Sequence, residues 1–78
     1  MNSVSYSLIA SIADQFNAID CVWRESERSF TRFMAEVWFT ELPSEFATKW
    51  AEVVGYAVKV RRVDRGVAKY AVSVPCVL

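Results

Sequence analysis

The sequence predicts an α+β domain in which three helices are followed by a C-terminal antiparallel β-hairpin packed on the helices. Apolar residues recur at helical spacing before Gly55, and they alternate at strand spacing after it. A turn signal, Asp64-Arg65-Gly66, separates the two expected strands. The 78 residues are 54% apolar and include two glycines and two prolines, so one small globular domain over residues 1–78 is expected.

The first helix is expected to begin at Ser3 or Ser5, because either serine could cap it, and to end near Asn17. Residues 17–22 would then connect it to the next element. The apolar face of this helix would be formed by Leu8, Ile9, Ile12, Phe16 and Ile19.

A second helix is indicated by an apolar stripe at positions i, i+3, i+4, i+7 and i+8. The stripe consists of Phe30, Phe33, Met34, Val37 and Trp38, and Trp23 would extend it if the helix began that early. Phe39 lies about 180° from the stripe at ~100° per residue. It should therefore be exposed unless the helix has already ended. An exposed aromatic beside Arg32 is a candidate anchor for a partner.

The third helix is expected from about Pro43 to Val54. Proline suits the first turn of a helix, and Gly55 is well placed to end it. The apolar face would carry Phe46, Trp50, Val53 and Val54.

The hairpin has an expected register in which Val63 faces Val67. One face is then apolar, with Val60 opposite Tyr70, and the other is basic, with Arg61 opposite Lys69. The expected basic surface consists of Lys59, Arg61 and Lys69 on the outer face, with Arg62 and Arg65 at the tip. It is either a solvated face that prevents edge pairing or a docking surface for an acidic partner.

Charge is unevenly distributed although the formal net charge is zero. Residues 59–69 hold five basic side chains and one aspartate, a local charge of +4. The rest of the chain holds four basic and eight acidic side chains, a charge of −4. General attraction to nucleic acid or to a membrane is therefore not expected, whereas a contact with one specific surface is.

The residues of common active sites are missing from the sequence. Without histidine, the chain cannot form Ser–His or Cys–His nucleophile pairs, and two glycines are too few for a phosphate-binding loop. We therefore expect no enzyme activity, no cofactor and no metal. Cys21 and Cys76 are expected to be reduced thiols, and neither a signal peptide nor a membrane span is evident. These features favour the bacterial or host cytosol.

Two functions are compatible with these features. The first is a protein-binding or inhibitory module that covers a partner's acidic surface, by analogy with phage or mobile-element inhibitors of host nucleic-acid-handling complexes such as anti-CRISPR proteins. The second is a winged-helix-like domain that binds nucleic acid with the basic hairpin as its wing. A homodimer through the hairpin edge is a further possibility. The candidate contact residues are Lys59, Arg61, Arg62, Arg65, Lys69, Phe39 and Arg32.

Overall fold

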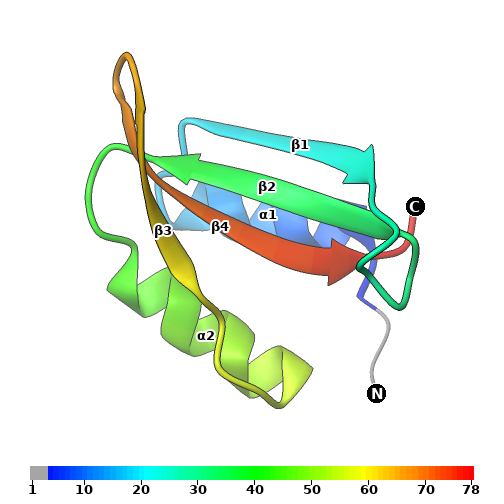
Figure 1. Ribbon diagram of the computed structural model, residues 1–78. Helices are drawn as coiled ribbons and strands as arrows, with labels where there is room; N and C mark the ends of the chain where they lie inside the picture. The colour runs from blue at the N-terminus through cyan, green and yellow to red at the C-terminus, as the bar shows by residue number, and fades with distance from the viewer. Residues whose placement is uncertain (1–3) are drawn as a thin grey trace.

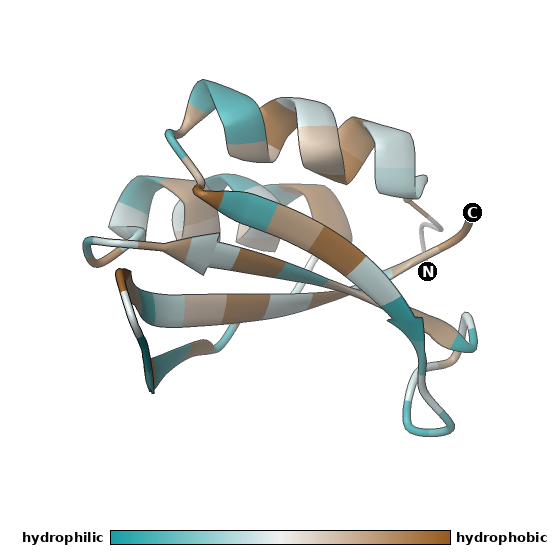
Figure 2. Cartoon of the chain, turned by 90° about the horizontal axis from the view of Figure 1, so that it is seen from above, coloured by the Kyte–Doolittle hydropathy of each residue, from teal (hydrophilic) through white to brown (hydrophobic). Residues whose placement is uncertain are grey.

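The computed structural model describes residues 4–78, which form two helices and four strands (Figure 1). The strands belong to one antiparallel sheet with the order β1-β2-β4-β3. Both helices cover the same face of this sheet, and the other face is open (Figure 2). In chain order the elements are α1 (Tyr6–Gln15), β1 (Asp20–Glu25), β2 (Phe33–Phe39), α2 (Ser44–Val54), β3 (Val60–Arg65) and β4 (Ala68–Cys76).

The expected arrangement of three helices and one hairpin is wrong, because the segment assigned to the second helix is the β1–β2 hairpin. Along β2 the buried residues alternate at strand spacing: Ala35, Val37 and Phe39 are buried, and the residues between them are partly exposed. β2 also pairs with a strand on each side, so its backbone groups are bonded within the sheet. The apolar pattern of this segment therefore fits a central strand better than an amphipathic helix.

The loop between β1 and β2 shows why a helix does not run through this segment. The Ser29 hydroxyl accepts a hydrogen bond from the Thr31 backbone N–H at 3.2 Å and donates one to the Phe33 carbonyl at 3.0 Å. The Thr31 hydroxyl donates to the same carbonyl at 2.9 Å. Such local side-chain bonds compete with helical hydrogen bonds. Arg32 adopts a left-handed backbone conformation (φ 68°), which a helix would not allow.

The other two helices are present close to their expected positions. The Ser5 hydroxyl caps α1 by accepting a hydrogen bond from the Leu8 N–H at 3.2 Å, whereas Ser3 lies outside the described residues. α2 ends at Gly55, whose φ of 84° is left-handed, as expected for a glycine terminator.

The strand connections give two similar halves, α1–β1–β2 and α2–β3–β4, which meet along the β2–β4 pair. β2 and β3 run parallel with β4 between them and are joined by α2, which is a split β-α-β unit. At the two ends of the described chain, the Tyr6 N–H donates to the Val77 carbonyl at 2.7 Å, and the Val77 N–H donates to the Val4 carbonyl at 2.9 Å. If the elements are followed from β4 across this contact to α1 and then along the chain to β3, they come in the order β-α-β-β-α-β. Ferredoxin-like sandwiches have this order.

The hydrophobic core fills the layer between the sheet and the two helices. Phe46 is its centre: its ring lies 5.1 Å from that of Phe39, and 6.0 Å from each of those of Phe16 and Trp50. The buried residues of the cluster are Val4, Ile9, Ala13, Ala35, Val37, Phe39, Phe46, Trp50, Val72, Val74 and Cys76.

The β3–β4 hairpin exists, but its register differs from the expected one by two residues. Val60 pairs with Val72 and Arg61 pairs with Ala71, so Arg61 does not face Lys69. The turn is formed by residues 66 and 67 instead of Asp64 to Gly66, and Gly66 supplies the positive φ of 63° that such a tight turn requires. From Val60 to Arg62 the shift of two residues leaves the side chains on their expected faces, whereas an irregularity between Arg62 and Arg65 changes the register again near the turn.

Tyr6 connects α1 to β1, because its hydroxyl donates a hydrogen bond to the Cys21 carbonyl at 2.6 Å. Burial, followed by hydrogen bonding at Cys21, raises the pKa of Tyr6 from 10.0 to about 12. The folded protein thus holds the phenolic proton more tightly than the unfolded chain does. The free energy of unfolding is therefore expected to fall as the pH rises from 10.0 to about 12.

The Tyr6→Phe variant tests this expectation, because it lacks the titrating hydroxyl but keeps the ring. Urea unfolding of both proteins below and above the ordinary tyrosine pKa should show a smaller alkaline loss of stability in the variant. Burial also raises the pKa of the Cys21 and Cys76 thiols, but these groups are common to both proteins. Equal alkaline losses in the two proteins would contradict the assignment.

Candidate functional site

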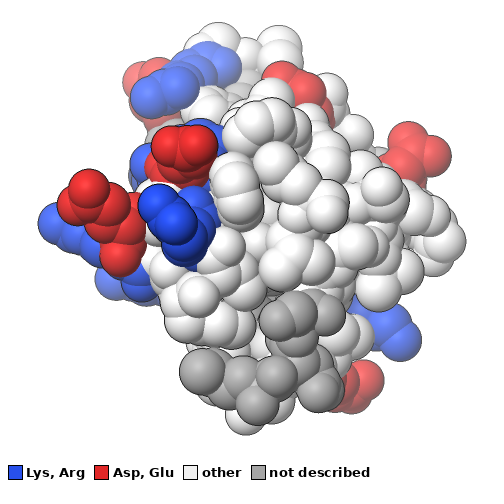
Figure 3. All heavy atoms as spheres, turned by 90° about the vertical axis from the view of Figure 1, so that its right-hand side faces the viewer, with Lys and Arg blue, Asp and Glu red and all other residues white. Residues whose placement is uncertain are grey.

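The open face of the sheet is the part of the molecule that neither helix covers. The registers place Val22, Glu36 and Ser73 side by side in one row of this face, and Trp38, Ala71 and Arg61 in the next. Side chains of alternate residues in four neighbouring strands therefore form one surface. Figure 3 shows charged side chains of both signs gathered along one side of the molecule, beside a largely uncharged area.

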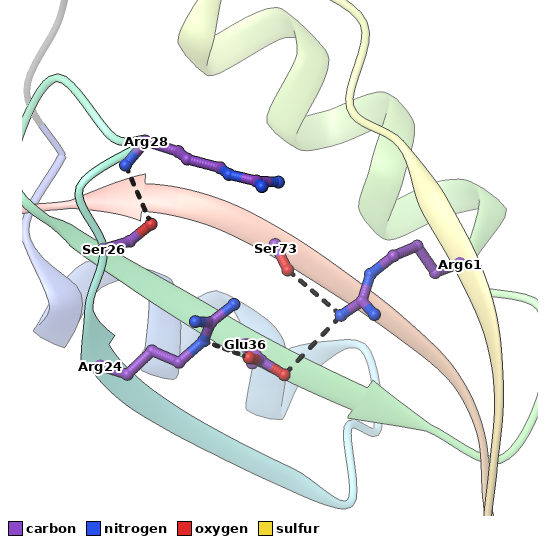
Figure 4. Close-up of polar contacts among 6 residues, drawn as sticks. All are labelled: Arg24, Ser26, Arg28, Glu36, Arg61 and Ser73. Carbon is purple, nitrogen blue, oxygen red and sulfur yellow. Dashed lines mark hydrogen bonds and ion pairs between the residues drawn. The ribbon is translucent and has the colours of Figure 1, made fainter.

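The middle of the open face holds a cluster that we call the Glu36 cluster, formed by Glu36, Arg24, Arg61 and Ser73 (Figure 4). Arg24 Nε lies 2.5 Å from one carboxylate oxygen of Glu36, and Arg61 lies 3.7 Å from the other. Arg61 also donates to the Ser73 hydroxyl at 3.4 Å. The Glu36 side chain is 14% exposed, whereas those of Arg24 and Arg61 are 58% and 45% exposed. Two guanidinium groups share one carboxylate, so the cluster presents a net positive charge to solvent.

One end of the open face is a hollow, which we call the Trp38 hollow, of about 510 Å³. The Arg65 guanidinium lies 4.8 Å from the centre of the Trp38 ring, in a cation–π arrangement. The apolar side chains around it are exposed: Ile19 by 43%, Val22 by 41% and Val67 by 71%. The start of β1, the end of β2 and the β3–β4 turn meet here. Its lining residues are Ile19, Asp20, Val22, Trp38, Arg65, Val67 and Ala68.

The basic residues of the hairpin do not form the continuous patch that the sequence predicts. Arg61 belongs to the Glu36 cluster, and Arg65 lies over Trp38. Lys69 is paired with Asp64 at 3.3 Å. Arg62 is opposite Tyr70, and Lys59 precedes β3; both are exposed. Of the five basic side chains, Arg61 and Arg65 therefore make two separate contacts on the open face, one with Glu36 and one with Trp38.

The expectation that Phe39 is an exposed anchor is wrong. Phe39 is 4% exposed and packs against Phe46 in the core, because the strand period directs it toward the helices. Arg32 is exposed, but it directly precedes β2. The first residue of β2, Phe33, pairs with Cys76 and is far from the β3–β4 turn. Arg32 and Phe39 are thus at opposite ends of β2 and do not form one site.

The sequence indicated that Glu36 is exposed, but it placed Trp38 in the core. It also did not connect Glu36, Ile19, Val22 or Arg24 with the basic residues of the hairpin. The signal that could have found them is the two-residue alternation of Met34, Glu36 and Trp38, which places all three on one face of a strand.

The remaining features of residues 4–78 concern metal ions, membranes and thiols. This part of the chain contains no group of three or more Cys, Asp or Glu side chains that could hold a metal ion. Neither of its helices is long and apolar enough to cross a membrane. Both cysteines are free thiols in the described structure.

Comparison with known proteins gives no relative: no family model, no curated protein and no solved structure matches this chain.

The Glu36 cluster gives a testable contribution to stability. Replacing Glu36 by glutamine leaves two arginines beside an uncharged amide, so the free energy of unfolding should fall by about 1 kcal/mol at low salt and by less at high salt. Denaturant unfolding at two salt concentrations measures the effect. Asp64→Asn is the matched control, because the Asp64 side chain is 92% exposed and its loss should change stability little. Equal effects of the two substitutions would contradict a structural role for Glu36.

Proposed function

We propose that the protein is a non-enzymatic binding module that docks a protein partner on the Trp38 hollow and acts by covering the partner's surface. The observation that carries the proposal is the Arg65 guanidinium on Trp38 in a hollow bordered by three exposed apolar side chains. Tryptophan and arginine are the residues most enriched at the energetic centres of protein interfaces. Apolar patches surrounded by polar residues also mark interaction sites.

The charges around the hollow support a partner with acidic residues beside an apolar side chain. Arg65 has no carboxylate within ion-pair distance among residues 4–78. The Glu36 cluster adds a net positive charge on the same face. An apolar side chain of the partner would occupy the hollow, and its carboxylates would meet Arg65, which has no ion-pair partner of its own in the described part of the chain. A phage-type inhibitor of a host nucleic-acid-handling complex, of the anti-CRISPR kind and acting in the cytosol, is the form of the proposal to test first.

Affinity purification with matched variants tests the proposal. The wild-type chain should capture a partner that Arg65→Glu and Val67→Ser lose, and the purified pair should show the same pattern in calorimetry. Leu42→Ser and Arg62→Glu are the controls, because Leu42 is 59% exposed in the loop before α2 and Arg62 is an exposed cation outside the hollow. If all four variants bind the partner equally, the hollow is not the docking site.

Nucleic acid is the competing ligand, and a duplex-DNA titration separates it from protein. The winged-helix outline is wrong for this fold, and Arg61 and Lys69 are already paired with carboxylates. We therefore expect no retardation of duplex DNA at low salt. Retardation that Arg65→Glu abolishes, and that weakens steeply with salt, would favour nucleic acid instead.

A further inference from the structure

The two edges of the sheet differ in how well they are protected against pairing with another strand. β3 carries Arg61, Arg62 and Arg65, and its pairing is irregular between Arg62 and Arg65. Charges and bulges of this kind prevent edge-to-edge association. The hairpin edge, which the sequence suggested as a dimer contact, is therefore the protected one.

β1 forms the opposite edge and has no such irregularity. It pairs with β2 without interruption from Asp20 to Glu25, and within residues 4–78 no strand pairs with its outer side. Exposed apolar side chains are concentrated on it and just before it: Ile19 is 43% exposed, Val22 41% and Trp23 47%. An uninterrupted, partly apolar edge is a template for a further strand.

We propose that β1 pairs antiparallel with β1 of a second copy of this chain, so that the two sheets become one continuous sheet across a two-fold axis. A two-fold interface uses the same segment in both copies, and it requires that the segment be complementary to itself. The sequence of β1 meets this requirement in one register.

The geometry of an antiparallel pair limits the possible registers. Two residues that face each other in an antiparallel pair form either a hydrogen-bonded pair or a non-hydrogen-bonded pair. Hydrogen-bonded and non-hydrogen-bonded pairs alternate along the two strands. In a symmetric pair of β1 strands, even-numbered residues must therefore face even-numbered ones, and odd-numbered must face odd. The two-fold axis then passes through one residue and its copy.

Only the register centred on Val22 matches the charges. It places Asp20 opposite Arg24 of the second copy on both sides of the axis, and Cys21 opposite Trp23. Centring on Cys21 would face Asp20 with Val22, and centring on Trp23 would face Arg24 with Val22. Opposite charges that face each other across strands stabilise a sheet, and like charges destabilise it.

The side chains in this register are available for the contact. The Arg24 side chain is 58% exposed and uses only Nε for Glu36, so its other donors can reach the second copy's Asp20. Trp23 packs edge-on against Phe33, with ring centres 5.7 Å apart, and half of it remains exposed. Pairing would cover Trp23 and Val22, which gives the dimer an apolar contribution.

The dimer does not depend on the proposed docking of a partner. Ile19, Asp20 and Val22 border both surfaces, but Arg65 and Val67 belong to the hollow and not to the β1 edge. Oligomeric mass therefore tests the dimer, and binding of a partner by Arg65 and Val67 variants tests the hollow.

Sedimentation equilibrium of the purified chain is the first test. We expect a monomer–dimer equilibrium that Asp20→Lys weakens about tenfold, because two like-charge pairs replace two opposite-charge pairs. Glu52→Lys makes the same charge change at an exposed position on α2 and should leave the equilibrium unchanged. Unchanged circular dichroism would show that each variant is folded. A monomer at high-micromolar concentration, or equal weakening by both variants, overturns the proposal.

Disulfide cross-linking tests the register. In a Cys21→Ser background, Val22→Cys should cross-link to its own copy under mild oxidation, because facing Cα atoms in antiparallel strands lie within the range that a disulfide spans. Trp23→Cys is the matched control, since it faces residue 21 and should not cross-link. Preferential cross-linking of Trp23→Cys would place the axis one residue away and overturn the proposed register.

Discussion

Phe39→Ala is expected to lower the free energy of unfolding by about 3–5 kcal/mol. Phe39 is 4% exposed, and its ring lies 5.1 Å from that of Phe46, so truncation leaves a cavity between the sheet and α2. A domain of this size has a total stability of the same order, about 5–15 kcal/mol or less. Thermal and urea unfolding should both show the loss.

Phe30→Ala is the matched control for this prediction. Phe30 is 49% exposed in the β1–β2 loop, and its truncation should change stability by no more than about 0.5 kcal/mol. The pair also separates the structure from the sequence-based hypothesis, in which Phe39 is an exposed partner contact. A Phe39→Ala protein as stable as the wild type, with loss of partner binding alone, would support that hypothesis and contradict the core position.

Trp50→Ala is expected to have an effect at least as large, about 3–5 kcal/mol, because Trp50 is fully buried and its ring packs on Phe46 at 6.0 Å. Trp50→Phe should cost clearly less. The indole Nε1 of Trp50 is buried without a hydrogen-bond partner among the described residues, and phenylalanine removes this desolvated donor while keeping an aromatic ring.

Unfolding curves of the two Trp50 variants measure this difference. The alanine variant should be largely unfolded, and the phenylalanine variant should keep a cooperative transition. Equal losses in the two variants would contradict this expectation, because they would mean that the phenylalanine ring keeps none of the packing that alanine loses.

The parts of the fold that the sequence predicted are those with local signals. Ser5 caps α1, Gly55 ends α2, and Gly66 forms the turn of the last hairpin. Each signal is a local backbone requirement that only a few residue types satisfy well. Long-range requirements had no such signal, and the β3–β4 register was accordingly wrong by two residues.

The β1–β2 hairpin was missed because its second strand fits two periods. Residues 33–39 are apolar except Glu36, so a helical stripe and a two-residue alternation can both be drawn through them. Phe39 did not fit the helical stripe, and this misfit was the correct indication of a strand. Tertiary pairing on both sides of β2 decided between the periods, and that pairing cannot be inferred from local spacing.

The candidate site was predicted only in part, for the same reason. Arg61 and Arg65 were identified as basic hairpin residues, and both are on the open face. Their neighbours Glu36 and Trp38 come from the missed strand, so neither the ion pair nor the cation–π contact could be anticipated. A surface assembled from four strands becomes visible only when their order is known.

The β2–β4 pair also determines how the chain can reach its folded state. It joins Phe33 to Cys76 and Phe39 to Tyr70, residues far apart in sequence, while each flanking hairpin forms from near neighbours. Neither half can bury its apolar face alone, because a two-stranded hairpin with one helix leaves the β2 or β4 edge bare. The slow step should therefore be the meeting of two preformed hairpins, with the entropy of closing a long loop as its main barrier. Substitutions within this central pair should slow refolding, whereas changes on the outer strands should mainly speed unfolding.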